Sequence, residues 1–334
     1  MRADILYQKV LDLSRCLVKK FEKIKYILKK ALRGTMRYRN LSGFLKEKYG
    51  RRLKKICIDG GFSCPNRDGK CGVGGCIYCS ERGSGDHINA ALSIEEQVRA
   101  ALAHASDDDR FIAYFQNFTN TYASPEVLRE RYGAALIDKR IVALAIGTRP
   151  DCIDGAVAEL IASYKSEVDV WVELGLQSAS DNTAKIINRG YDTSVYFSAA
   201  EILNGYGIDF VTHIMIGLPG EGDSELEATI NAVNRASSRG IKIHSVYVPK
   251  GTALEKMYLR GEYEPIEMGD YIRRAVYAIR HISPDTVIHR LTGDCPRDML
   301  VAPEWNLKKN DVLCGIADML NMLDARQGDK YIPD

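Results

Sequence analysis

The chain alternates between short apolar segments and helix-like segments, and this alternation restricts its possible folds more than any other feature. Six apolar segments are expected to be strands, at 55–61, 111–116, 141–148, 168–176, 208–217 and 241–248. Helices are expected between them, at 93–105, 125–136, 154–164, 181–188, 194–205 and 223–238. Strands rich in Val, Ile and Ala along their whole length predict a parallel sheet that is covered on both faces.

No G-x-G-x-x-G motif opens a helix after a strand, which argues against a dinucleotide-binding fold. We therefore expect an α/β fold, a partial (β/α)6 TIM-type barrel of parallel strands over residues 36–260. Its functional site should lie at the carboxyl ends of the strands. Residues 261–334 are expected to form a small C-terminal α/β extension, with helices at 265–282 and 308–324 and a strand at 286–294.

Positive charge is concentrated near the N-terminus. Residues 1–56 hold eighteen Lys and Arg against four Asp and Glu, although the whole chain carries a net charge of only +2. Residues 1–35 are expected to form a basic amphipathic helical extension that either packs on the domain or binds a polyanion, such as nucleic acid or a membrane surface. Met36, just after this segment, is an alternative start codon.

The composition indicates the cellular compartment of the protein. No run of eighteen apolar residues is present, which predicts no transmembrane segment, and the first residues lack the apolar core of a signal peptide. The nine cysteines are an odd number, in a chain too long to need disulfide staples. We expect a cytoplasmic protein whose clustered cysteines bind a metal, because thiols stay reduced in that compartment.

Four of the cysteines fall in one segment, "CPNRDGKCGVGGCIYC", at 64–79. A structural zinc ion takes four ligands, so Cys71 would have to complete that set. An iron–sulfur cluster held by three thiolates would instead leave one iron open. The single close pair, Cys76 and Cys79, favours the cluster, and spacing alone leaves both metals possible.

Polar side chains follow the other five predicted strands. They are Gln116 and Asn117; Thr148, Arg149 and Asp151; Glu173 and Gln177; His213 and the turn 217–221; and His244, Tyr247 and Lys250. Since the carboxyl ends of parallel strands gather on one rim, we expect one shared active site. Arg149 and Asp151 form either an ion pair within a turn or an anion-binding group. We consider His213, His244 and Lys250 as candidate catalytic residues, or as residues satisfied within the core.

Eight short motifs resemble, in the same order, the YhcC-like group of radical S-adenosylmethionine (SAM) proteins. They are "CPNRDGKCGVGGCIYC", "YFQNFTNTYA", "IGTRPD", "VELGLQS", "INRG", "GLPGE", "PKGT" and "HRLTGD". The resemblance runs from about Tyr38 to the end of the chain. "TRPD" and "ELGLQS" are also similar to the radical SAM domain of the Elongator catalytic subunit, an enzyme that acts on tRNA wobble uridine. The chain has no room for the acetyltransferase domain of that enzyme.

The resemblance implies the cofactors and the residues that hold them. Cys64, Cys76 and Cys79 correspond to the ligands of one 4Fe–4S cluster, while Cys71 lies in an insertion where the family does not require cysteine. The positions that correspond to SAM-binding residues are Tyr78, Gln116, Asn117, Glu173, Gln177, Gly217, Leu218 and Pro219. In such a site the reduced cluster cleaves SAM to a 5′-deoxyadenosyl radical, which abstracts a hydrogen from the substrate.

The resemblance also implies a substrate and partners. We expect modification of a tRNA wobble-uridine side chain, with phosphates bound by the basic segment 1–56. The alternative substrate is a small anionic metabolite or a porphyrin-like anion, because distant relatives act on coproporphyrinogen. A zinc-stabilised nucleic-acid-binding module without catalysis is a third hypothesis. Radical SAM chemistry further requires an external electron donor, such as flavodoxin or ferredoxin.

Overall fold

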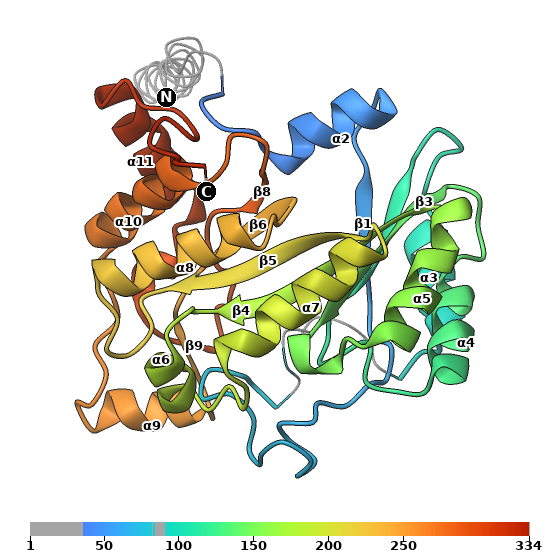
Figure 1. Ribbon diagram of the computed structural model, residues 1–334, viewed down its shortest axis with the longest axis horizontal. Helices are drawn as coiled ribbons and strands as arrows, with labels where there is room; N and C mark the ends of the chain where they lie inside the picture. The colour runs from blue at the N-terminus through green and yellow to red at the C-terminus, as the bar shows by residue number, and fades with distance from the viewer. Residues whose placement is uncertain (1–35, 82, 84–90, 334) are drawn as a thin grey trace, which may run out of the picture.

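The computed structural model describes residues 36–81, 83 and 91–333 (Figure 1). The helical extension expected at 1–35 lies outside the described residues. Seven parallel strands form one curved sheet in the order β1-β2-β3-β4-β5-β6-β8. These strands are β1 (Lys54–Ile58), β2 (Phe111–Phe115), β3 (Ile141–Thr148), β4 (Asp169–Gln177), β5 (Asp209–Ile216), β6 (Gly240–Ser245) and β8 (Val287–Arg290). The sheet is a half-barrel, which confirms the expected α/β partial TIM-type barrel.

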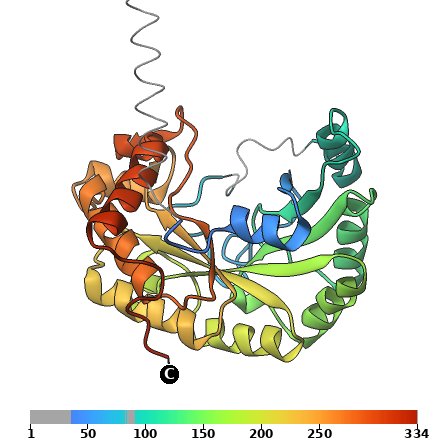
Figure 2. The same cartoon turned by 90° about the horizontal axis from the view of Figure 1, so that it is seen from above.

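Helices follow most of the strands and lie along the convex side of the sheet (Figure 2). The α-helices are α2 (Leu41–Tyr49), α3 (Ile94–Leu102), α4 (Pro125–Ala135), α5 (Gly155–Ser163), α6 (Asp181–Ile186), α7 (Thr193–Gly205), α8 (Asp223–Arg235), α9 (Ala253–Leu259), α10 (Met268–His281) and α11 (Lys309–Met322). Their starts follow local sequence signals. Ser93 and Glu96 form a capping box at α3, and the Asp154 side chain accepts a hydrogen bond from the first turn of α5.

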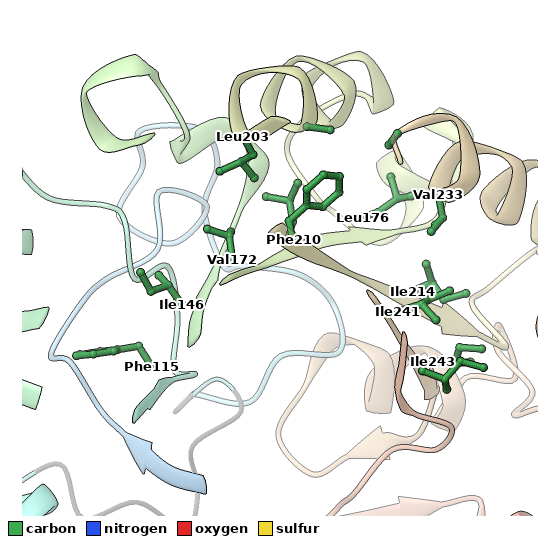
Figure 3. Packing of buried hydrophobic residues seen from close by; sticks show 14 of the residues in the cluster. Phe115, Ile146, Val172, Leu176, Leu203, Phe210, Ile214, Val233, Ile241 and Ile243 are labelled. Atoms are coloured by element: carbon green, nitrogen blue, oxygen red, sulfur yellow. The ribbon is translucent and has the colours of Figure 1, made fainter. Parts of the chain in front are cut away.

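The outer face of the sheet is buried beneath these helices. Figure 3 shows Leu203 of α7 and Val233 of α8 above the strand residues Val172, Leu176 and Phe210, and all five are 0% exposed. Each such side chain contributes about 1.5–3 kcal/mol when it leaves water. This packing explains why the sequence of each strand is apolar on the helix-facing side.

The inner face is apolar only near the beginnings of the strands. There Leu45 of α2 packs in one cluster with Ile112, Trp171 and Val211, and Figure 2 shows α2 within the concave side of the sheet. Helix α2 therefore closes the end of the half-barrel at which the strands begin. The strands are apolar on both faces for this reason, as the sequence indicated.

Segments far apart in the sequence meet beside α2. The Arg37 guanidinium donates to Asn321 Oδ1 at 2.7 Å, and the Arg37 carbonyl accepts a hydrogen bond from the Gln327 amide at 2.9 Å. Asn40 forms a parallel bridge with Ile288 of β8. The first and last described parts of the chain are thus joined directly.

The structure differs from expectation after β6. The strand predicted at 286–294 is β8, which joins the main sheet beside β6 as a seventh strand. The predicted strand 241–248 ends at Ser245, and Val248–Pro249 (β7) pairs instead with Leu300–Ala302 (β9) in a separate antiparallel sheet. Within residues 36–81, 83 and 91–333, no helix is long and apolar enough to cross a membrane.

Candidate active site at the carboxyl ends of the strands

The cysteine segment forms a loop directly after β1, on the carboxyl side of the sheet (Figure 1). Tight turns shape it, with the Arg67 amide bonded to the Cys64 carbonyl and the Cys79 amide bonded to the Cys76 carbonyl. Ile77 fixes the loop to its surroundings. Its amide donates to the Ile187 carbonyl at 3.1 Å, and its carbonyl accepts from the Leu254 amide at 2.9 Å.

The surroundings of Cys76 favour its thiolate form. A hydrogen bond from the Cys79 thiol lowers the pKa of Cys76 to about 6, and Arg149, Tyr78 and Asn66 act in the same direction. The same hydrogen bond raises the pKa of Cys79, because its proton is held between the two sulfurs. The thiolate is the form that binds metal, so Cys76 is largely ready at neutral pH.

Cys64 lies near this pair, since its charge affects the pKa of Cys79. Among the described residues, however, no three Cys, His, Asp or Glu side chains form a group that could already hold a metal ion. Thiolates are the donors that an iron–sulfur cluster takes, so the donor chemistry of the three cysteines fits such a cluster. Cys71 is exposed and lies beside Asp151.

Arg149, directly after β3, is bonded to Asp151 and to the turn after α6. Its Nε and Nη2 donate to the two carboxylate oxygens of Asp151 at 2.9 and 2.7 Å, and its Nη1 donates to the Arg189 carbonyl at 2.9 Å. Tyr191 lies between two cations, with the Arg149 and Arg189 guanidinium carbons 4.8 and 4.4 Å from the centre of its ring. All three nitrogens of the Arg149 guanidinium are therefore already bonded.

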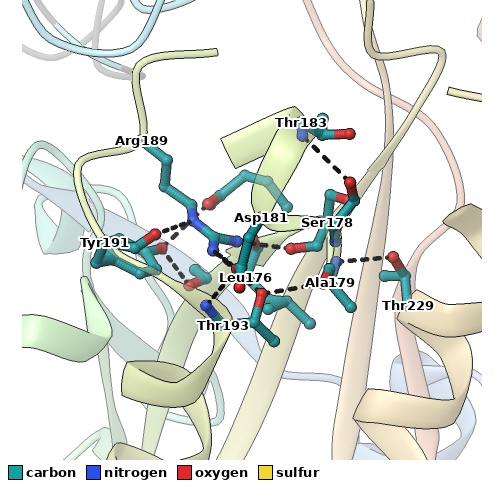
Figure 4. Close-up of polar contacts among 12 residues, drawn as sticks. Leu176, Ser178, Ala179, Asp181, Thr183, Arg189, Tyr191, Thr193 and Thr229 are labelled. Atoms are coloured by element: carbon teal, nitrogen blue, oxygen red, sulfur yellow. Dashed lines mark hydrogen bonds and ion pairs between the residues drawn. The ribbon is translucent and has the colours of Figure 1, made fainter. Parts of the chain in front are cut away.

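Arg189 has the largest of the fully buried side chains and organises the turn after β4 (Figure 4). Its Nη1 donates to the carbonyls of Leu176 and Ser178 at 2.6 Å each, and its Nε donates to the Tyr191 carbonyl at 3.0 Å. These bonds hold the backbone on both sides of Gln177, whose φ of 61° is left-handed. The Gln177 side chain accepts a hydrogen bond from the Tyr191 hydroxyl at 3.2 Å.

The residues after β2 and β5 lie on the same rim. Asn117 is 2% exposed and donates to Asp59 Oδ2 at 2.7 Å, while its own Oδ1 is buried without a partner. After β5, Gly217 has a left-handed φ of 98°, and an added Cβ would lie 2.8 Å from Ile266. Leu218 and Pro219 follow it and are buried.

A charged cluster lies deeper, on the inner face of the half-barrel. Glu173 is fully buried and forms a close ion pair with Lys242, and His213 Nε2 lies 2.9 Å from its Oε2. Although burial alone raises the pKa of Glu173, the charge of Lys242 and the hydrogen bond with His213 bring it well below the usual value. The His244 ring lies 5.2 Å from that of His213, and its Nε2 is buried without a partner. Burial lowers the pKa of both histidines, so both rings are neutral at neutral pH.

The structure thus gathers most of the candidate residues on one rim and within the concavity below it. The carboxylate of Glu173, expected near SAM, is hydrogen-bonded to Lys242 and His213. Lys250 is an exposed turn residue. Sequence reasoning missed Lys242, although a lysine within a strand that is otherwise apolar is itself a signal of a buried partner. It also assigned no role to Arg189, which belongs to the "INRG" motif.

Comparisons with known proteins agree with this geometry. Residues 68–233 match the radical SAM superfamily, and residues 238–321 match the radical SAM C-terminal domain. The chain is 39% identical to "Protein YhcC" of Escherichia coli, over 79% of this chain and 85% of that protein. It is 31% identical to a "tRNA uridine(34) acetyltransferase" of Dehalococcoides mccartyi, over 47% of this chain and 34% of that protein. The structure of archaeal Methanocaldococcus infernus Elp3 superposes with a TM-score of 0.62 at 19% identity, covering 82% of this chain and 64% of that one.

The half-barrel, the cysteine loop and these matches define a radical SAM enzyme. Within that superfamily, the chain belongs to the YhcC-like family.

Proposed function

We propose that the protein binds one 4Fe–4S cluster through Cys64, Cys76 and Cys79 and uses it to cleave SAM reductively. The supporting observation is a cysteine loop at the rim of a parallel half-barrel, where the hydrogen bond from Cys79 lowers the pKa of Cys76, in a chain of this family. When bound, the cluster supplies an open iron for SAM and the electron that generates a 5′-deoxyadenosyl radical. Family membership favours this cluster over a structural zinc ion.

The rim residues are proposed to bind SAM. The unpartnered Oδ1 of Asn117 is an acceptor suited to the ammonium group of SAM, with Gln116 beside it. Gln177 is held by Tyr191 and is available to the ribose, and Tyr78 lies beside Cys76. The turn formed by Gly217, Leu218 and Pro219 is assigned to the adenine.

The concave face is proposed to hold the substrate. His213 is oriented by Glu173 through Nε2, which leaves Nδ1 as the nitrogen that can exchange a proton with the substrate. His244 presents an unpartnered Nε2 beside it. Arg149 acts electrostatically on Cys76, and Asp151 holds the Arg149 guanidinium in place through two hydrogen bonds.

An anaerobic assay tests the cofactor chemistry. The purified protein is reconstituted with iron and sulfide, then given dithionite and SAM, and 5′-deoxyadenosine is measured. The wild type is expected to form the product and Cys76→Ala to form none. Cys71→Ala is the matched control and should keep both the iron and the product. Zinc in the protein as isolated, with no product after reconstitution, would refute the proposal.

We further propose that the substrate is tRNA, modified on a wobble-uridine side chain. Support comes from the similarity to the tRNA uridine(34) acetyltransferase and from the basic N-terminal segment 1–56. Several cations of its described part are paired internally, including Lys48 with Asp169 and Lys54 with Asp109. These residues lie at the end of the half-barrel opposite the cysteine loop (Figure 1).

Phosphates near the rim are therefore assigned to Lys70, Lys185 and Lys250, which are exposed. The double variant Lys70→Glu/Lys250→Glu should weaken tRNA binding and reduce the slope of log K against log salt by about 2. Lys46→Glu, in α2, is the control at the opposite end, and deletion of residues 1–35 measures the contribution of the extension. Weak binding that does not depend on salt would favour the small anionic substrate.

A further inference from the structure

The Asn66 side chain touches one of the proposed cluster ligands. Asn66 lies two residues after Cys64 and is 0% exposed. Its Nδ2 lies 3.7 Å from the Cys76 sulfur and 2.6 Å from the carbonyl oxygen of Asn188. An amide nitrogen carries two N–H groups, so one can donate to each of these acceptors.

The orientation of this amide is fixed by its neighbours. The Asn188 carbonyl accepts hydrogen bonds only, so the nitrogen of Asn66 has to face it, and the same nitrogen then faces Cys76. Glycines enclose the oxygen on the other side. A Cβ added at Gly72 or Gly190 would lie 2.3 or 2.9 Å from Asn66 Oδ1. The amide therefore has little room to turn away from the sulfur.

Asn188 hydrogen-bonds back to the cysteine loop, so Asn66 and Asn188 together form a reciprocal clasp between the two loops. Its Nδ2 donates to the Gly75 carbonyl at 2.8 Å and to the Val73 carbonyl at 3.2 Å. Its backbone is left-handed, with φ at 52°, a conformation that glycine also adopts readily. These hydrogen bonds tie the cysteine loop to the turn that carries Arg189. Of the two asparagine side chains, that of Asn66 contacts a cysteine sulfur, and that of Asn188 binds backbone carbonyls.

We propose that Asn66 is a positioning residue that donates an N–H···S hydrogen bond to the Cys76 sulfur and thereby raises the reduction potential of the cluster. This inference rests on the proposed binding of the cluster by Cys64, Cys76 and Cys79. Reduction places additional negative charge on the cluster and its sulfur ligands. A hydrogen-bond donor at one of these sulfurs stabilises the reduced form, and the sulfur hydrogen bonds are among the factors that set the potential.

A redox titration followed by electron paramagnetic resonance tests the inference. Asn66→Leu keeps a similar volume and removes the donor, so its cluster should be harder to reduce. At a fixed solution potential near the wild-type midpoint, the ratio of oxidised to reduced cluster should rise about tenfold, which corresponds to about 59 mV for one electron. Asn188→Gly is the matched control. It keeps the left-handed backbone, removes the other half of the clasp, and should leave the midpoint unchanged.

A second measurement uses the wild type and does not depend on the folding of a variant. In protein grown with asparagine labelled by ¹⁵N in the side chain, pulsed electron paramagnetic resonance of the reduced cluster should detect a coupled ¹⁵N. Equal iron content with an unchanged midpoint in Asn66→Leu, or no coupled ¹⁵N in the wild type, overturns the inference alone. A wild-type protein that takes up no 4Fe–4S cluster overturns the proposed function, and the inference with it.

Discussion

Replacing Lys242 with methionine should destabilise the protein strongly, because it leaves a buried carboxylate without its cation. The Lys242 side chain is 5% exposed and that of Glu173 is 0% exposed. The methionine side chain has a similar length and is apolar like the methylene chain of Lys242, so the change removes mainly the charge. The Lys242 ammonium also lies 3.2 Å from the Tyr114 hydroxyl, which loses this neighbour as well.

The magnitude follows from what remains around Glu173. Breaking a buried ion pair by removing one partner costs about 3–5 kcal/mol. Glu173 keeps a hydrogen bond with His213 at 2.9 Å and a weaker contact with the Trp171 indole at 3.4 Å. We therefore expect the lower end of the range, a loss of about 3 kcal/mol in the free energy of unfolding. This loss corresponds to a fall of roughly 100-fold in the folding equilibrium constant.

Denaturant unfolding of the cluster-free protein, followed by tryptophan fluorescence and circular dichroism, measures this loss. Lys55→Met is the control, since Lys55 is exposed and lies over the same Tyr114 ring, and it should cost less than about 1 kcal/mol. The double variant Glu173→Gln/Lys242→Met should recover part of the stability, because no uncompensated charge remains. The reasoning fails if Lys242→Met costs no more than the control, or if the double variant is less stable than the single one.

Three further outcomes follow from buried or strained groups. Burial lowers the pKa of His289 from 6.5 to about 3, so the protein should lose stability as pH falls through this range, and His289→Phe should reduce that loss in thermal unfolding. Arg189→Lys leaves main-chain carbonyls without donors and should cost about 3 kcal/mol, whereas Arg260→Lys at an exposed site should be nearly neutral in the same measurement. Gly217→Ala forces a side chain into a left-handed φ against Ile266, so equilibrium dialysis of the reconstituted protein should show weaker SAM binding, and unchanged binding would contradict the assignment of this turn.

Much of the half-barrel could be predicted because most strand residues are apolar and several helices begin at a local capping signal. The seventh strand was assigned to a separate extension because β7, α9 and α10 intervene before it in the chain. Sequence adjacency is a weak guide to strand order once such insertions occur. The pairing of β6 with β8, from Gly240 with Val287 to Lys242 with Arg290, shows that β8 continues the same sheet.

Site residues could be predicted where a sequence motif itself indicates the chemistry. They were harder to predict where the role of a residue depends on a partner that is distant in the chain. The cysteines and the rim residues could be placed from strand ends alone. Glu173 was expected near SAM, and the structure adds Lys242 as its partner, 69 residues away in the chain, which the sequence around Glu173 does not identify. Asn66 and Arg189 belong to recognisable motifs, yet their roles depend on which carbonyls and sulfurs approach them in three dimensions.

The contact between residues 37–40 and 321–327 has a consequence for biosynthesis. A ribosome makes Arg37 and the cysteine loop well before Asn321 and Gln327, which bind Arg37. β8, the neighbour of β6 in the sheet, is made only after β7, α9 and α10, so β6 lacks that neighbour while these elements are synthesised. The nascent half-barrel therefore carries β6 as an open sheet edge during that interval, when an unpaired strand is prone to associate with other chains.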